Sequence, residues 1–129
     1  MLLDSSYLID LEEEIAERKF GPAIAFANAH RASAPRISII TLGELAAGAL
    51  DEGNTRRFFA RYRVITLKPE IAYLAGRLER ALSLKGQRLG ENDNWIAATA
   101  LYYGEPIVTR DGDFDRVMRA GLPLRVLRY

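Results

Sequence analysis

The chain has 129 residues, of which 49% are hydrophobic and 27% charged, and its formal net charge at pH 7 is +1. This composition is typical of a folded globular protein, and the length suits one domain spanning residues 1–129. Because the chain has no Cys and a single His, His30, the sequence excludes disulfides, thiolate zinc sites and a Cys nucleophile, and it argues against a Ser-His-Asp triad.

No apolar run approaches the roughly 18 residues that a membrane-spanning helix needs, and Asp4 interrupts the N-terminus too early for a signal-peptide pattern. We therefore expect a cytoplasmic protein without membrane association. Of the 18 basic residues 15 are Arg, whose planar guanidinium suits phosphate binding, although a GC-rich genome favours the same composition. Any chemistry must come from carboxylates, hydroxyls, basic side chains or a metal held by oxygen.

Short apolar runs alternate with segments of helical pattern, and neither a repeat nor a linker divides the chain. In its first half, we expect strands at 1–3, 37–40 and 64–67, separated by helices at 7–18, 23–31, 41–50 and 55–62. Thr41 and Glu44 fit the capping box that opens a helix, so we place the start of the third of these helices at Thr41.

In the second half, Pro69 opens a long amphipathic helix that runs to Leu84. We expect a loop at 86–90, helices at 93–103 and 113–120, and strands at 106–109 and 124–127. This alternation of strands and helices predicts a three-layer α/β domain with a mostly parallel sheet. Such sheets bind ligands outside the carboxyl ends of their strands, at the point where the strand order reverses.

Acidic residues recur at those carboxyl ends or in the helix turns beside them. Asp4 follows the first strand, and Glu44 lies in the first turn after the second strand. Asp93 opens the helix before the fourth strand, and Asp111 follows that strand with Asp113 close behind. If the first and fourth strands are neighbours, Asp4 and Asp111 face each other, and four carboxylates converge on one crevice.

Such convergence is unfavourable without a cation, because two unit charges about 4 Å apart repel by ~4 kcal/mol at an effective dielectric constant near 20. A divalent cation relieves this repulsion, and all-oxygen ligands favour Mg²⁺ or Mn²⁺. A metal held in this way can activate water and stabilise a phosphoryl oxyanion.

Each acid also has a structural explanation that the spacing leaves open. Asp4 and Asp113 are plausible helix N-caps, and Asp93 lies between two Asn residues at a helix start. Glu44 completes the capping box, and Asp111 with the following Gly is a turn signal.

Four segments together resemble the PIN domain and, among PIN domains, the VapC-type toxin ribonucleases of bacterial toxin–antitoxin pairs. They read MLLDSSYLIDL (1–11), ISIITLGELAAGA (37–49), GENDNWIAATAL (90–101) and PIVTRDGDF (106–114). The segments occur in the family's order and cover nearly the whole chain. The resemblance implies a five-stranded sheet in the order 3-2-1-4-5 with helices on both faces.

The resemblance further implies a metal-dependent endoribonuclease that holds one or two Mg²⁺ or Mn²⁺ ions. The family's metal-binding acids fall on Asp4, Glu44 and Asp93. The closing segment is one residue shorter here than in the family, so the fourth acid falls on Asp111, with Asp113 as the second choice.

The resemblance also implies supporting residues and partners. Thr109 and Ser6 match positions that orient the metal site, although the family often has Asn at the position of Ser6. Arg110 and Arg116 are candidate RNA phosphate contacts. The family implies an RNA substrate, a second copy of the chain in a homodimer, and an antitoxin whose C-terminal segment covers the acidic crevice with an Arg.

Other functions make different demands on the sequence. A phosphoacceptor receiver domain needs an acid pair after its first strand and a late Lys, and a haloacid-type phosphatase needs Asp-x-Asp where this chain has Asp4 and Ser6. The alternative that we retain is a catalytically silent PIN-like module that binds RNA or protein. DNA also stays open as a nuclease substrate.

Overall fold

A five-stranded, fully parallel sheet in the order β3-β2-β1-β4-β5 forms the centre of the computed structural model, which describes all residues from 1 to 129. This order confirms the 3-2-1-4-5 arrangement that the sequence resemblance implies. The strands are short: β1 (Leu2–Leu3), β2 (Arg36–Ser38), β3 (Arg63–Ile65), β4 (Ile107–Val108) and β5 (Val126–Leu127).

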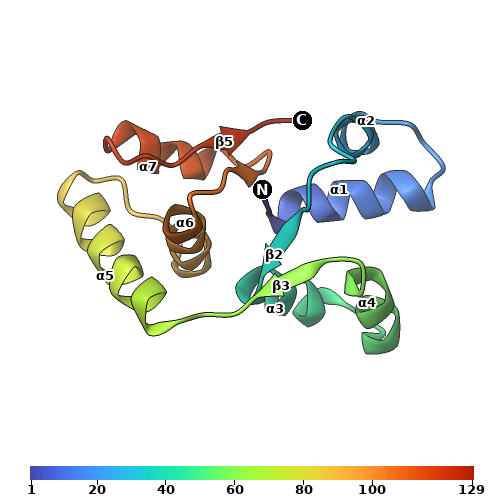
Figure 1. The fold of residues 1–129 in the computed structure, drawn as a ribbon, viewed down its shortest axis with the longest axis horizontal. Coiled ribbons are helices and arrows are strands. Elements are labelled where there is room, and N and C mark those ends of the chain that lie inside the picture. Colours follow the sequence, from blue (N-terminus) through green and yellow to red (C-terminus); the bar gives the residue numbers. More distant parts are fainter.

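Helices cover both faces of the sheet, so the fold has three layers (Figure 1). Their bounds are α1 (Ser5–Ala16), α2 (Pro22–Ala29), α3 (Ile39–Gly48), α4 (Glu52–Phe59), α5 (Pro69–Leu84), α6 (Glu91–Tyr103) and α7 (Asp115–Arg119), with a 3₁₀ turn, η1 (Gly112–Phe114), before α7. None of these helices combines the length and the apolar character that a membrane span requires.

Side chains alternate between two cores along each strand, because successive residues of a strand point to opposite faces. Leu2 and Ile107 belong to a core of 16 buried residues that packs against α5 and α6. Leu3 and Val108 belong to a core of eight buried residues that packs against α1 and α2. Both faces are therefore buried, which explains why β1 and β4 are apolar throughout instead of alternating with polar residues.

Strands β1 and β4 are neighbours, with Leu2 opposite Ile107 and Leu3 opposite Val108. The pairing continues one residue further, where the peptide N–H of Asp4 donates to the carbonyl of Val108 at 3.1 Å. Since β1 also pairs with β2, the strand order reverses at β1. The segment after β1 and the segment after β4 therefore emerge side by side at the position where parallel sheets bind ligands.

The prediction of a capping box at Thr41 is wrong. Strand β2 ends at Ser38, and α3 begins at Ile39 because the buried Ser38 side chain caps it, accepting a hydrogen bond from the peptide N–H of Thr41 at 2.9 Å. The β-branched Ile39 and Ile40, which the sequence analysis assigned to the strand, form the first helical turn instead. Glu44 therefore lies beyond the first turn and has no capping function.

Smaller differences concern other helix ends. Helix α4 begins at Glu52, three residues before the predicted start, because Asp51 caps it by accepting from the peptide N–H of Asn54. Helix α6 begins at Glu91 after an N-cap at Gly90, so Asp93 is the third residue of the helix and not its cap. The single helix expected at 113–120 is divided into η1 and α7.

The Ser38 cap predicts a measurable contribution to stability. Ser38→Ala removes a buried N-cap that also lies 3.0 Å from the Thr41 hydroxyl, and we expect it to lower the free energy of unfolding by about 1–2 kcal/mol in urea denaturation. Asp51→Ala, at the exposed cap of α4, is the matched control and should lose only about 0.5–1 kcal/mol. A smaller loss for Ser38→Ala than for Asp51→Ala would contradict this assignment of the α3 cap.

Candidate active site

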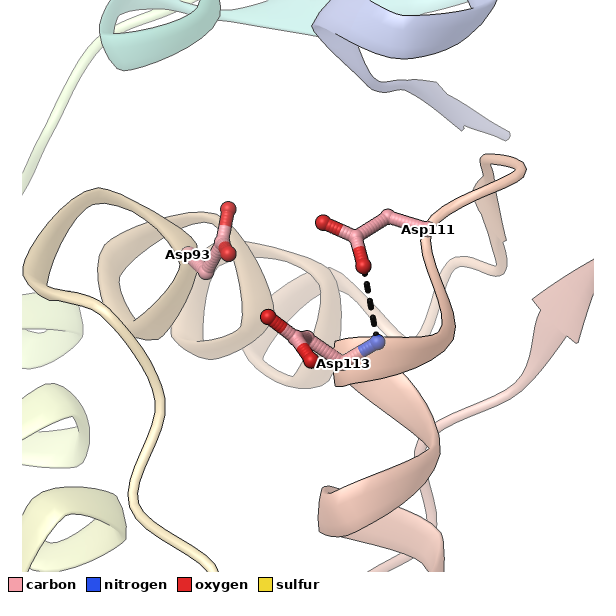
Figure 2. A group of neighbouring side chains, drawn as sticks. All are labelled: Asp93, Asp111 and Asp113. Atoms are coloured by element: carbon pink, nitrogen blue, oxygen red, sulfur yellow. Dashed lines mark hydrogen bonds between the residues drawn. The ribbon is translucent and has the colours of Figure 1, made fainter.

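Three aspartates from two separate segments share one site beyond the end of β4. Asp93 comes from the first turn of α6, whereas Asp111 and Asp113 come from the turn that follows β4. One carboxylate oxygen from each lies within 4.8 Å of the others, and all three residues are half-buried. Figure 2 shows the carboxyl groups of Asp111 and Asp113 directed toward that of Asp93.

A short hydrogen-bonded turn presents Asp111 and Asp113 together. The peptide N–H of Asp111 donates to the Thr109 hydroxyl at 2.9 Å, and Oδ1 of Asp111 accepts from the peptide N–H of Asp113 at 2.8 Å. Asp111 is therefore the N-cap of η1, and the prediction of Asp113 as a helix cap is wrong. This cap occupies one oxygen of Asp111, and the carboxylate of Asp113 takes no part in capping.

Asp4 is almost fully buried, with 3% of its surface exposed. It occupies the N-cap position of α1, but its carboxylate forms no capping hydrogen bond. Instead, Oδ2 accepts from the Ser6 hydroxyl at 2.9 Å and from the Thr109 hydroxyl at 2.8 Å. The two hydroxyls fix the orientation of the carboxylate, so Asp4 stands at the N-cap position without capping α1 through its side chain.

Glu44 reaches the site from α3 as a half-buried side chain. Its Oε1 accepts from the Asn92 side-chain amide at 3.1 Å, while its Oε2 is buried and has no hydrogen-bond partner. An unpartnered buried carboxylate oxygen is rare and calls for a positive partner. Asn92 is a site residue that no sequence pattern indicated, since its only signal is its place beside Asp93 at the helix start.

The acids form one electrostatic cluster around Asp93. Burial and repulsion from Asp4, Asp111, Glu44 and Asp113, in that order, raise the pKa of Asp93 to about 6. Carboxylates that face each other in a partly buried site resist simultaneous ionisation, and a divalent cation is the general way to relieve this.

The donor set fits a hard divalent cation. All candidate ligands are carboxylate oxygens, which Mg²⁺ and Mn²⁺ prefer. Oε2 of Glu44 is a further candidate ligand atom, because it is buried and has no hydrogen-bond partner. The group whose oxygens lie within 4.8 Å of one another comprises Asp93, Asp111 and Asp113. The group does not include Asp4 or Glu44. The negative charges of these two acids contribute to raising the pKa of Asp93.

The two arginines expected to contact phosphate are both ion-paired. Arg116 lies at the cluster itself, since its Nη2 is 3.0 Å from Oδ1 of Asp113, and its Nη1 donates to the carbonyl of Arg88. The guanidinium of Arg110 pairs with Asp10 on α1 at 2.7 Å, and 61% of the Arg110 side chain is exposed.

Comparisons with known proteins agree with this geometry. The PIN domain family matches residues 1–120. Ribonuclease VapC4 of Mycobacterium tuberculosis is 30% identical over 87 residues, which are 60% of this chain and 67% of that protein. The crystal structure of VapBC2 from Rickettsia felis bound to a promoter DNA fragment matches with a TM-score of 0.80 and 20% identity over 99% of this chain and 97% of that one. The crystal structure of DNA-bound VapBC from Salmonella typhimurium matches with a TM-score of 0.76 and 25% identity, and the match covers 98% of this chain and 96% of that one.

Because the pKa of Asp93 is raised, ionisation of this carboxyl group lowers the folding stability, and Asp93→Asn should remove this loss. Between about pH 4 and pH 6 the unfolded chain loses the Asp93 proton while the folded protein keeps it, so folding stability falls as the pH rises through this window. Allowing for solvent screening of this half-buried group, we expect Asp93→Asn to match the wild type near pH 4 and to be about 1–2 kcal/mol more stable at pH 7 without metal.

Urea denaturation in EDTA across this pH range measures the effect. Glu91→Gln, which removes an exposed charge from the same helical turn, is the control and should shift stability by less than about 0.5 kcal/mol at either pH. An Asp93→Asn variant that is no more stable than the wild type at pH 7 would show that the acids do not repel as described.

The hydroxyl of Thr109 also makes a testable contribution, because it donates to Asp4 and accepts from the peptide of Asp111. Thr109→Val keeps the shape but removes both bonds and the 3.0 Å hydrogen bond with the Ser6 hydroxyl, and we expect the free energy of unfolding to fall by about 1–3 kcal/mol in thermal or urea unfolding. Thr99→Val is the control, because this equally buried Thr bonds only to a carbonyl of its own helix, that of Trp95. Equal losses in the two variants would contradict a special role for Thr109.

Proposed function

Because the chain belongs to the PIN-domain family, we propose that it is a VapC-type toxin, an endoribonuclease that hydrolyses RNA phosphodiester bonds with Mg²⁺ or Mn²⁺. The observation that carries this proposal is the convergence of Asp93, Asp111 and Asp113 within 4.8 Å, beside the buried Asp4 and the unpartnered Oε2 of Glu44. Helix capping does not account for Glu44, because α3 is capped by Ser38 and the buried Oε2 of Glu44 has no hydrogen-bond partner.

The residues divide between holding the metal and orienting its ligands. Asp4, Glu44, Asp93 and Asp111 would hold one or two ions, with Asp113 beside them. When bound, the metal lowers the pKa of a coordinated water and stabilises negative charge on the phosphate. One carboxylate of the cluster would take the proton of the water whose oxygen bonds to the RNA phosphorus. The P–O bond to one ribose oxygen would break in the same displacement, and that leaving oxygen would be protonated from solvent.

The proposal includes a protein partner. The solved structures that resemble this chain include DNA-bound VapBC proteins and a member of the VapBC family of toxin–antitoxin systems from Mycobacterium tuberculosis, and we infer a cognate antitoxin for this chain in the cytoplasm, together with a homodimer. The Arg116–Asp113 ion pair supports an antitoxin segment that places an Arg among the acids, because a guanidinium already lies against this cluster. Such a segment would compete directly with the metal and with RNA.

Cleavage of a labelled RNA pool tests the activity. The purified protein, free of antitoxin by mass spectrometry, should cut RNA with Mg²⁺ or Mn²⁺ and should not cut it in EDTA. Asp93→Asn should lower the rate at least about 100-fold, because removing a metal ligand has a larger effect than the 10–100-fold typical of residues that only support the ligands. Glu91→Gln should cut at the wild-type rate.

Other outcomes separate the alternatives. Cleavage that persists in EDTA, or in Asp93→Asn, would contradict a metal-dependent site at this cluster. RNA binding without cleavage in any metal would favour the catalytically silent module. A DNA pool measured in parallel identifies a deoxyribonuclease.

A further inference from the structure

The side chain of Arg128 reaches back from the end of the chain to the turn that carries Asp111 and Asp113. Its Nη1 donates to the carbonyl of Thr109 at 3.1 Å and to the carbonyl of Asp111 at 2.6 Å. Its Nη2 donates to Oδ1 of Asp115, at the start of α7, at 2.6 Å. One guanidinium therefore bonds to the beginning, the middle and the end of the turn.

The other supports of this turn each hold a single residue: the peptide N–H of Arg110 donates to the Ser6 hydroxyl at 3.3 Å, the Arg110 guanidinium pairs with Asp10, and Arg116 pairs with Asp113. The ladder of the sheet ends where the peptide N–H of Thr109 donates to the carbonyl of Leu127 at 3.2 Å. Beyond that point the hydrogen bonds of Asp111 and Asp113 are local, to the Thr109 hydroxyl and to each other. Without Arg128, the carbonyl groups of Thr109 and Asp111 would lose their side-chain donor, and no single group would join the two ends of the turn.

The position of Arg128 is itself fixed on both sides. Arg128 directly follows β5, and the Tyr129 ring after it packs edge-on against Tyr7 with ring centroids 4.8 Å apart. The Tyr129 hydroxyl donates to Oδ2 of Asp10 at 2.6 Å. The same Asp10 pairs with Arg110, which lies within the turn. The C-terminal dipeptide is thus held from the sheet and from α1.

We propose that Arg128 is a positioning residue that holds Asp111 and Asp113 in register with Asp93 for metal binding. Its guanidinium bonds to the backbone carbonyls of Thr109 and Asp111 and to the carboxylate of Asp115, and it touches no carboxylate of the metal-binding candidates, so it acts through the turn. Arg128 lies beyond residue 120, where the PIN-domain match ends. The inference rests on the proposed function, because it assigns a role in the same metal site.

Arg128→Ala tests this role, with Arg125→Ala as the matched control. Arg125 precedes the same strand, and its guanidinium bonds to the carbonyl of Gly104 through Nη2 at 2.8 Å, in the loop that leads into β4. Mn²⁺ affinity, measured by electron paramagnetic resonance of the free ion, should fall about tenfold in Arg128→Ala and stay within about twofold of the wild type in Arg125→Ala. Arg128→Lys, which keeps a donor at this place, should recover part of the affinity.

Activity gives a second readout. RNA cleavage by Arg128→Ala should lose rate at low Mn²⁺ and recover when Mn²⁺ is raised about tenfold, because the defect lies in metal binding. Circular dichroism and urea denaturation establish that each variant is folded. If Arg128→Ala does not fold, Arg128→Lys and Arg128→Gln replace it in the same comparison with Arg125→Ala.

Two results would overturn the inference while leaving the proposed function intact. One is an Arg128→Ala protein that binds Mn²⁺ and cuts RNA as the wild type does. The other is an equal loss of affinity in Arg125→Ala, which would indicate a general effect of weakening the C-terminal strand. Failure of the wild-type protein both to bind Mn²⁺ and to cut RNA would overturn the inference and the proposed function together.

Discussion

The pairing of β1 with β4 is the contact on which the site depends. It places Asp4 beside Thr109, so that one hydroxyl can bond both to the Asp4 carboxylate and to the peptide that begins the Asp111 turn. Residues more than 100 positions apart in the chain thus share one hydrogen-bond network. The buried carboxylate of Asp4 is tolerated at 3% exposure because two hydroxyl donors replace the water that it has lost.

The acids beyond this network create the opposite problem, because they gather negative charge in a partly buried place. The acids that carry this charge come from three separate elements: α3, α6 and the turn after β4. Arg116 neutralises part of it through Asp113, and protonation of Asp93 near pH 6 removes another part. The metal-free protein thus has two internal means of reducing the repulsion that a bound cation would remove altogether.

The proximity of the segments that carry Asp4 and Asp111 could be predicted from the sequence because it follows from topology, whereas the group within 4.8 Å includes Asp113, the second choice, and leaves out Asp4 and Glu44. Acids after β1 and β4 must meet when these strands are parallel neighbours, and the strand order came from the family resemblance. The caps predicted at Thr41 and Asp113 are wrong because each helix start has two residues that could cap it. The alternatives are Ser38 and Thr41 for α3, and Asp111 and Asp113 for the turn after β4. Ser38 and Asp111 are the residues that cap, since each lies where the strand has just ended.

The contacts that no sequence pattern indicated are those between elements distant in the chain. Asn92 meets Glu44 only because α6 packs near α3, and Arg128 meets the Asp111 turn only because β5 lies next to β4. Side chains of this kind have no periodicity or spacing that a single sequence could reveal. Their partners depend on how the elements pack.

The two edges of the sheet have a consequence for how this protein meets other molecules. The edge strands β3 and β5 contain three and two residues, so each offers very few free backbone groups to an incoming strand. Short edges of this kind suppress strand addition and edge-to-edge aggregation. Association through an extended, sheet-continuing segment is therefore disfavoured, and contacts with other chains must rely on helix surfaces, loops and side chains.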